Sequence, residues 1–387
     1  MSRGRSVAVR LVLAVGLVAV LAAALTACGS GSSSSGTTTS ETKGGEAKEL
    51  DALYAGEWTM PPTSGPAAEE GKEVWFISCG QAFENCSIAS EKFKEAGTAL
   101  GWKVTVVDGE ANPSKANELI KQAVAAHVDG IASIAWDCPT IKSGLLAAKA
   151  ADIPVVNFGG FDCDFKAFGG GEPLFTKTEN VLGGPSFENY IDSYETARAE
   201  AMLALTGGGD QKILQLEEQS LTNSKVKSEA FKKTVEAKCP ECTLVPVKWQ
   251  YAQVPQEATQ IWKSAIQQNP DATVLVASSD DIMNLGLRSA IQQSGNRNLF
   301  VMGAEGPPPN QELIREGFES AALAIPPGFA WQMWGEADTL NRVFANSKEF
   351  PDEGGGWVLI DKEHVPAEGE EIKTPDYQGD FEKIWNG

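Results

Sequence analysis

The chain has 387 residues, of which 42% are hydrophobic, and a formal net charge of −20 at pH 7. A strongly acidic surface repels nucleic acid and is poorly matched to polyanionic substrates, so we expect no nucleic-acid partner. The length exceeds that of one typical hydrophobic core and predicts two lobes.

The N-terminus has the pattern of an export signal. Three arginines precede an apolar stretch that is shorter than the about 20 residues of a membrane-spanning helix. The stretch ends in Leu-Thr-Ala-Cys, which resembles the lipobox of bacterial lipoproteins and implies lipidation of Cys28. We therefore predict a signal peptide over 1–27 and a lipidated, flexible Gly/Ser/Thr-rich tether over 28–70. The alternative is an ordinary secretory signal that contains a cysteine by chance.

Six cysteines remain after Cys28, and export to an oxidising compartment favours disulfides among them. Six cysteines allow fifteen pairings, from which we predict the three pairs that are nearest in sequence. A zinc site would need a second Cys or His pair near the CxxC, and the sequence has none. A redox-active CxxC would open a helix, whereas this one follows a helical segment. The predicted disulfides are Cys79–Cys86, Cys138–Cys163 and Cys239–Cys242.

From residue 73 onward, short apolar runs alternate with amphipathic segments. In the first half the predicted strands cover 74–77, 102–107, 129–136 and 153–158, and the predicted helices cover 87–100, 112–127 and 138–151. Asn112 and Pro113 have the pattern of a helix N-cap followed by a first-turn proline.

The alternation restarts after a glycine-rich interval. The predicted helices there cover 194–205, 224–237, 255–268 and 281–293, and the predicted strands cover 212–216, 243–249, 273–279 and 299–305. A final apolar run at 321–328 precedes the segment 330–344. The strands are apolar throughout, which indicates parallel sheets that are covered on both faces. The predicted fold class is therefore α/β, with two doubly wound Rossmann-like lobes, and the expected ligand site is the cleft between them.

Motifs for catalysis are missing. There is no GxSxG elbow and no P-loop, and neither His127 nor His364 lies in an acid–base setting. The acidic pair Glu217 and Glu218 is a candidate glycosidase dyad by composition alone. We predict that the protein is not an enzyme, and an exported α/β hydrolase or glycosidase is the alternative. A sugar-responsive repressor would share the fold but would need a helix-turn-helix in place of the signal peptide.

Three segments carry a resemblance to a known family: 101–158, 269–295 and 301–306. Between about residues 72 and 345 the chain resembles the solute-binding lipoproteins of bacterial ABC importers, of the type I, ribose-binding-like sugar class. The resemblance implies two lobes joined by a hinge. It places the N-terminal lobe at 71–188 plus 326–350 and the C-terminal lobe at 189–325 plus 351–387.

The same resemblance implies the partners and the location. The ligand would be a small sugar or polyol, delivered to an ABC permease with its ATPase. The protein would be a monomer without cofactor or metal. It would lie at the outer face of the cytoplasmic membrane, at the cell surface or in the periplasm, and would touch the membrane through its lipid anchor only.

Candidate ligand contacts follow position by position from the family, which uses the ends of its strands. Two positions depart from the pattern, since Gly159-Gly160 replaces a common Asp-Arg and Ile325 replaces a polar hinge residue. Each candidate also has a structural interpretation, as a core aromatic for Phe83 or Trp136, or as a helix N-cap for Asp280. The predicted ligand-binding residues are Gln81, Phe83, Asn85, Trp136, Asp137, Asn157, Asp162, Glu217, Lys227, Asp280 and Glu305.

Overall fold

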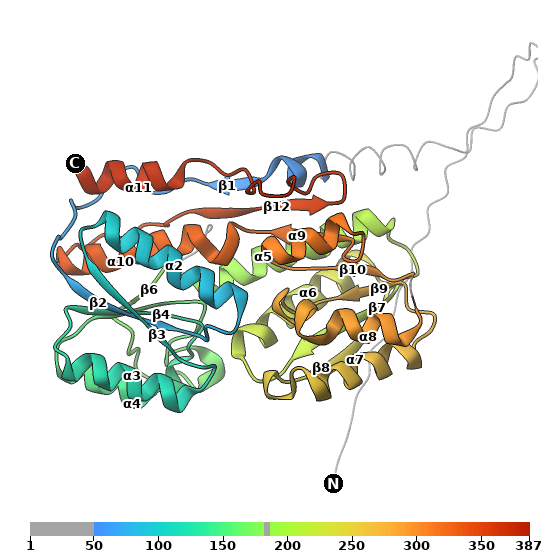
Figure 1. Ribbon diagram of the computed structural model, residues 1–387, viewed down its shortest axis with the longest axis horizontal. Coiled ribbons are helices and arrows are strands. Elements are labelled where there is room, and N and C mark those ends of the chain that lie inside the picture. Colours follow the sequence, from blue (N-terminus) through green and yellow to red (C-terminus); the bar gives the residue numbers. More distant parts are fainter. Residues whose placement is uncertain (1–49, 182–185, 297) are drawn as a thin grey trace, which may run out of the picture. The chain divides into compact units, whose positions relative to one another are not determined.

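A computed structural model describes residues 50–181, 186–296 and 298–387. The predicted signal peptide, Cys28 and the tether as far as residue 49 lie outside the described residues. Two sheets organise the described part of the chain (Figure 1). We call the part built on the five-stranded sheet the first lobe and the part built on the seven-stranded sheet the second lobe.

The first lobe is a parallel sheet in the order β3-β2-β4-β5-β6. Its strands are β2 (Glu73–Ser78), β3 (Lys103–Asp108), β4 (Gly130–Ile134), β5 (Val155–Phe158) and β6 (Lys177–Thr178). Side chains alternate between the faces, so Ile77 packs under α3 (Pro113–Ala125) and α4 (Cys138–Ala150), whereas Phe76 packs under α2 (Glu84–Ala99) and α10 (Ala330–Phe344). The continuous apolar strands of the sequence are explained by helices on both faces.

The second lobe repeats this winding. Its parallel strands are β7 (Lys212–Glu218), β8 (Thr243–Trp249), β9 (Val274–Val276), β10 (Phe300–Met302) and β11 (Ala321–Ala324), in the order β8-β7-β9-β10-β11. The helices are α5 (Phe187–Thr206), α6 (Thr222–Lys238), α7 (Gln256–Gln268), α8 (Arg288–Ser294) and α9 (Pro308–Arg315). Helices α5 and α6 share one core with Ile213 and Val276, and α7 and α8 share another with Leu214 and Leu275.

Both predicted lobes and their doubly wound topology are present. Among the parallel strands of each lobe the first lies between the second and the third, so the strand order reverses beside the first strand. In the first lobe this switch point lies between β2 and β4, and in the second lobe between β7 and β9. Ligands of open α/β sheets bind beyond the carboxyl ends of the strands at such a point. The loops after these four strands therefore define the candidate site.

Two elements correct the predicted boundaries. The strand β1 (Glu57–Thr59) pairs antiparallel with β12 (Gly355–Asp361), and the Tyr54 hydroxyl donates to Asp361 at 2.5 Å. The prediction of a flexible tether is therefore wrong for residues 50–70. A strand of three residues is too short to show a period in the sequence.

The C-terminal helix α11 (Tyr377–Asn386) corrects the second boundary. Trp385 stacks on Trp334 of α10, with ring centroids 5.4 Å apart, and its indole N–H donates to Asp338 at 2.7 Å. Because α10 covers the sheet of the first lobe, α11 belongs with that lobe and not with the second lobe as predicted.

Local capping follows the sequence where its signal is strong. The Asn112 side chain accepts the backbone N–H of Ser114 at 3.0 Å, and Pro113 occupies the first position of α3, as predicted. The remaining short helical turns are η1 (Lys166–Phe168), η2 (Tyr251–Gln253), η3 (Met283–Leu287) and η4 (Pro327–Phe329).

Candidate functional site

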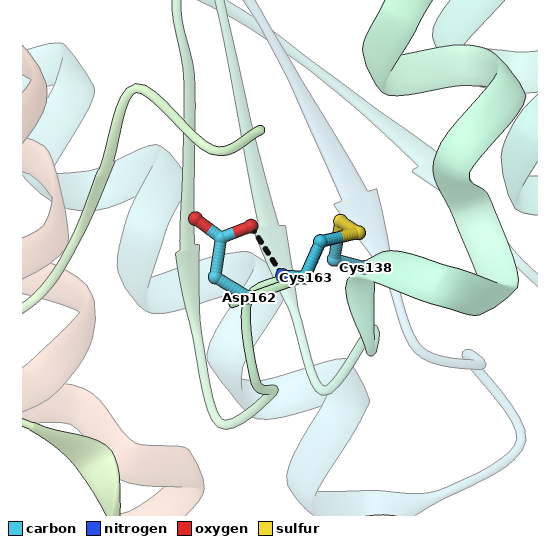
Figure 2. Close-up of side chains that lie close together, drawn as sticks. All are labelled: Cys138, Asp162 and Cys163. Carbon is cyan, nitrogen blue, oxygen red and sulfur yellow. Dashed lines mark hydrogen bonds between the residues drawn. A yellow bond between two sulfur atoms is a disulfide. The ribbon is translucent and has the colours of Figure 1, made fainter. Parts of the chain in front are cut away.

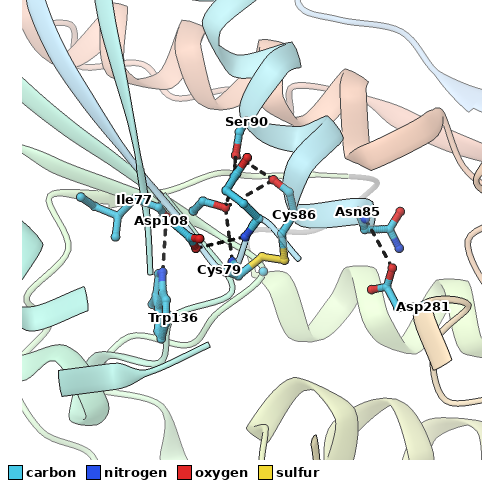
Figure 3. Close-up of a disulfide and its surroundings, with 12 residues drawn as sticks. Ile77, Cys79, Asn85, Cys86, Ser90, Asp108, Trp136 and Asp281 are labelled. Carbon is cyan, nitrogen blue, oxygen red and sulfur yellow. Dashed lines mark hydrogen bonds between the residues drawn. A yellow bond between two sulfur atoms is a disulfide. The ribbon is translucent and has the colours of Figure 1, made fainter. Parts of the chain in front are cut away.

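The loop after β2 is tied to the start of α2 by the predicted Cys79–Cys86 disulfide (Figure 3). Gln81 closes the same loop, since its amide donates to the hydroxyls of Ser78 at 2.7 Å and Ser90 at 2.8 Å. The predicted contact residue Gln81 therefore supports the loop with its side-chain amide. The rigid loop presents Phe83 and Asn85 toward the second lobe.

Phe83 and Asn85 both meet the second lobe directly. The Phe83 ring packs edge-on against Tyr251, with centroids 5.5 Å apart. The backbone N–H of Asn85 donates to the Asp281 carboxylate at 3.4 Å, a contact visible in Figure 3. The Asn85 side-chain oxygen is buried without a hydrogen-bond partner. These two predicted residues thus lie where the lobes face each other, and Asn85 has a spare acceptor.

The other candidates of the first lobe have structural partners. Trp136 is 5% exposed, and its indole N–H donates to the Ile77 carbonyl at 3.3 Å. Asn157 is 1% exposed, accepts from the Ser133 hydroxyl at 2.9 Å and donates to the Gly160 carbonyl at 3.2 Å. The structure thus places Trp136 in the core, the alternative that the sequence left open, and Asn157 below the loop surface.

Asp162 organises its own loop. One carboxylate oxygen accepts the backbone N–H of Cys163 at 2.7 Å (Figure 2) and the backbone N–H of Leu174 at 2.9 Å. Burial raises the pKa of Asp162, and these hydrogen bonds oppose the shift. The structure gives this carboxylate a role as the clamp of the loop that follows β5.

The three predicted disulfides are all present. The Cys138–Cys163 bridge joins the start of α4 to the loop after β5 (Figure 2). With Asp162 it forms the one group of three His, Cys, Asp or Glu side chains, among the residues described, whose ligating atoms lie within 4.8 Å of one another. A disulfide offers no thiolate, so this group is not a metal site.

In the second lobe, Lys227 and Glu305 form a buried ion pair. The Lys227 ammonium lies 2.8 Å from Glu305 and 3.9 Å from Glu195. Burial acts to raise the pKa of Glu305, but Lys227 outweighs it and holds the pKa below its usual value. The reverse holds for Lys227, because burial acts to lower its pKa and the two glutamates raise it overall. Both groups therefore remain charged, and the Lys227 side chain is 18% exposed.

Asp280 is fully buried and braces the neighbouring loop. Its two carboxylate oxygens accept the backbone N–H groups of Ala304 at 2.7 Å and Gly306 at 2.6 Å. The Asp280 carboxylate therefore fixes the loop that carries Glu305, in place of the N-cap role that was the alternative. Burial and the nearby Glu305 raise the pKa of Asp280 to about 6.

The next residue, Asp281, was not among the predicted contacts. Its carboxylate reaches the Asn85 amide of the first lobe, and burial together with Glu305 raises its pKa to about 7. The sequence signal was the doubled aspartate after β9, of which only the first was chosen. Tyr251, which faces Phe83, was also missed because it lies in the turn η2, outside the predicted elements.

Two further positions lie away from the facing loops. Glu217 is half-buried in β7, where Lys248 of the edge strand and Lys232 of α6 act on its charge. Its neighbour Glu218 is fully buried and accepts the backbone N–H of Leu221 at 2.8 Å, so the two glutamates have separate structural environments. Ile325 is 1% exposed and belongs to the core.

The N-terminus of α6 makes further contacts between the lobes. The Asn223 amide donates to the Gly159 carbonyl of the first lobe at 2.9 Å. The predicted contact residue Asp137 accepts hydrogen bonds from Thr222 and from the backbone N–H of Phe161. Burial raises the pKa of Asp137, and these hydrogen bonds oppose the shift. Gly159 is thus a backbone acceptor for the opposite lobe.

The residues where the lobes meet are of the kinds that bind small molecules. Aromatic rings and an amide meet between the two lobes, and the Lys227–Glu305 ion pair of the second lobe lies near Tyr251. Within the part of the chain that is described, no helix combines the length and apolar character required to cross a bilayer.

Comparisons with known proteins agree with this geometry. A family model described as a periplasmic binding protein domain matches residues 76–334. The D-apiose import binding protein of Actinobacillus succinogenes is 25% identical over 265 residues, which cover 66% of this chain and 77% of that protein. The ribose import binding protein of Escherichia coli K12 is 23% identical, over 58% of this chain and 69% of its own length.

Solved structures share the fold. The crystal structure of a galactofuranose binding protein superposes with a TM-score of 0.60 at 15% sequence identity, covering 82% of this chain and 99% of that chain. These relatives are binding proteins, so the comparisons give no support to the alternative of an exported hydrolase or glycosidase.

Proposed function

The chain belongs to the periplasmic binding protein family, and from this premise we propose that it captures a small sugar or polyol between its two lobes for an ABC importer. The observation that carries the proposal is that residues beyond the carboxyl ends of the strands of both lobes meet. Phe83 and Asn85 follow β2 of the first lobe, while Tyr251 and Asp281 face them from the second. A ligand held there touches both lobes and favours the closed form.

The residues at this meeting point suit a neutral polyhydroxylated molecule. The rings of Phe83 and Tyr251 offer apolar faces for C–H groups, and the Asn85 oxygen is a spare acceptor. Lys227 and Glu305 add charged partners for hydroxyls, which form stronger hydrogen bonds than neutral partners do. The names of the relatives, which import D-apiose and ribose or bind galactofuranose, support a sugar as the ligand class.

Export and anchoring complete the proposal. A family of periplasmic binding proteins works outside the cytoplasm, which agrees with the predicted signal peptide. Lipidation at Cys28 would hold the chain at the membrane next to its permease. Replacing Cys28 with Ala should leave an unprocessed precursor and remove the processed protein from the membrane fraction. Equal partitioning of the two proteins would contradict the anchor.

A ligand screen tests the binding function directly. Thermal shift measurements against aldopentoses, aldohexoses, furanose sugars and polyols should identify at least one stabilising compound, because a ligand of the native state raises its stability. Chromogenic glycosides and esters, assayed in parallel, should show no turnover. Turnover of any of them would point to a hydrolase, and a panel without any stabilising compound would contradict sugar binding.

A further inference from the structure

We propose that the first turn of α6 is a latch that holds the two lobes together by protein–protein contacts alone. We call Thr222 and Asn223 the latch, and the corner Gly159–Gly160 with Asp137 the seat. The proposal rests on the proposed function, since closure around a ligand is the step that the latch would control. It assigns Asp137 to lobe closure and not to the ligand contacts predicted from the sequence.

The latch is anchored by a direct hydrogen bond and by a helix cap. The Asn223 amide donates to the Gly159 carbonyl at 2.9 Å, between residues 64 positions apart. Helix α6 has no side-chain cap of its own at Leu221 and no acidic residue in its first turn. Asp137 of the opposite lobe accepts hydrogen bonds from Thr222 and so places a carboxylate at this helix N-terminus, where the helix dipole favours negative charge.

Contacts within the first lobe hold the seat in place. The backbone N–H of Phe161 donates to Asp137 at 3.0 Å, the N–H of Cys138 donates to the Phe161 carbonyl at 2.9 Å, and the Cys138–Cys163 disulfide ties the same two loops. A Cβ on Gly160 would lie 2.2 Å from the Trp136 carbonyl oxygen, so only glycine permits this close approach. The glycine pair therefore brings the corner against Asp137 and leaves the Gly159 carbonyl for Asn223.

The latch side is rigid as well. The fully buried Glu218 accepts the backbone N–H groups of Ser220 at 2.6 Å and Leu221 at 2.8 Å, which fixes the turn that leads into α6. Contacts between two preorganised surfaces lose little conformational entropy when they form. The closed form is therefore favoured by the chain itself, and a ligand adds its own contacts to a pre-existing state.

The test measures closure in the absence of any ligand. Fluorescent labels at Lys121→Cys on α3 and Gln267→Cys on α7, both exposed positions, report the distance between the lobes by single-molecule energy transfer. We expect the short distance to predominate in the parent protein. Asn223→Asp keeps the shape but turns a donor toward the Gly159 carbonyl into an acceptor. The ratio of closed to open molecules should fall about 2- to 12-fold, the range for a lost neutral hydrogen bond.

The control is Asn269→Asp, whose amide donates to the Ala265 carbonyl at 2.9 Å within the second lobe. This change should leave the closed-to-open ratio as in the parent, even where it lowers the melting temperature. Thr222→Val is a second latch variant, in case Asn223→Asp fails to fold, and it should shift the ratio in the same direction.

Identical distance distributions in the parent and in both latch variants would overturn the proposal, as would a parent that is open without ligand. Titration of the same variants with D-ribose and D-apiose separates the latch from the proposed function. Lobes that open in Asn223→Asp while neither sugar binds the parent would support the latch and contradict ribose and apiose as ligands. If the parent binds either sugar but the ratio of closed to open molecules is the same in the parent and in the latch variants, sugar binding is supported and the latch is contradicted.

Discussion

At the scale of single residues, the charged groups of the second lobe form a connected set in which each member depends on its neighbour. Asp280 holds the loop of Glu305 through two backbone amides, and Glu305 in turn pairs with Lys227. The chain places acidic residues at the strand ends, and this much can be predicted from the sequence. Whether a carboxylate faces a ligand or a backbone amide depends on side-chain direction, which the sequence pattern does not contain.

Removing the charge of Lys227 should destabilise the fold. In Lys227→Met the Glu305 carboxylate stays buried without its partner, and loss of one member of a buried ion pair costs about 3–5 kcal/mol. Denaturant unfolding measures this loss. The control is Lys233→Met on the same helix, whose lysine is 78% exposed and 3.9 Å from Asp192 and should cost less than 1 kcal/mol. A loss in Lys227→Met no larger than in the control would refute the role of the pair.

The raised pKa of Asp281 predicts a pH dependence of stability. The pKa lies at about 7 in the folded protein against 3.8 for a free side chain, so the folded state binds more protons between these values. Stability contributed by the protonated group should therefore be lost as pH rises from about 4 to 7. The facing groups are Glu84 and Asn85 on α2, with Asp280, Glu305 and Tyr251 in the second lobe.

Urea unfolding at pH 5, 6, 7 and 8 tests this dependence, with Asp281→Asn as the reference. The variant should lose less free energy of unfolding between pH 5 and 7 than the parent, because its amide does not titrate. Parallel curves for the two proteins would show that Asp281 does not carry the effect.

At the scale of elements, the site depends on how loops are fastened to the ends of strands. Disulfides, Asp162 and Gln81 fix the three loops of the first lobe, and Glu218 fixes the turn before α6. The disulfide pairs were predictable, because compartment and sequence proximity restrict the choices. The loop clamps were not, because they depend on backbone amides whose positions follow from the fold.

The long apolar helices and strands were predictable from their periods, whereas β1 was not. A period needs several turns or residues to be visible, as in α10, whereas β1 gains its place only by pairing with β12. Helix α11 shows an amphipathic face, but the sequence does not say which lobe covers that face. Its tryptophan packs on α10 of the first lobe.

Removing the Cys138–Cys163 bridge tests the fastening of the seat. The bridge spans 25 positions, and the loop-entropy model assigns about 3.5 kcal/mol to a closed loop of this length. The double variant Cys138→Ala/Cys163→Ala should therefore lose about 2–4 kcal/mol of unfolding free energy. The control is Cys239→Ala/Cys242→Ala, which removes a bridge at the C-terminal end of α6. The loop-entropy model gives about 2 kcal/mol for its short loop. A first variant as stable as the parent would show that the bridge does not hold the seat.

At the scale of the whole molecule, two sheets with the same winding direct their switch points at each other. The first lobe contributes Phe83, Asn85 and the seat, and the second contributes Tyr251, Asp281 and the latch. The duplicated α/β pattern made this architecture predictable from the sequence. The identity of the ligand was not predictable, because two of the positions considered for it, Gly159 and Ile325, serve the backbone and the core.

Calorimetric titration of the protein with a panel of sugars and polyols tests the central claim most directly. The account predicts one-to-one binding of at least one member. It also predicts that Phe83→Ala weakens this binding by about 1–3 kcal/mol, because the ring supplies an apolar face within the closed cleft. A folded protein that shows no binding heat with any member, or a ligand whose affinity is the same in the parent and in Phe83→Ala, would contradict capture of a sugar between the lobes.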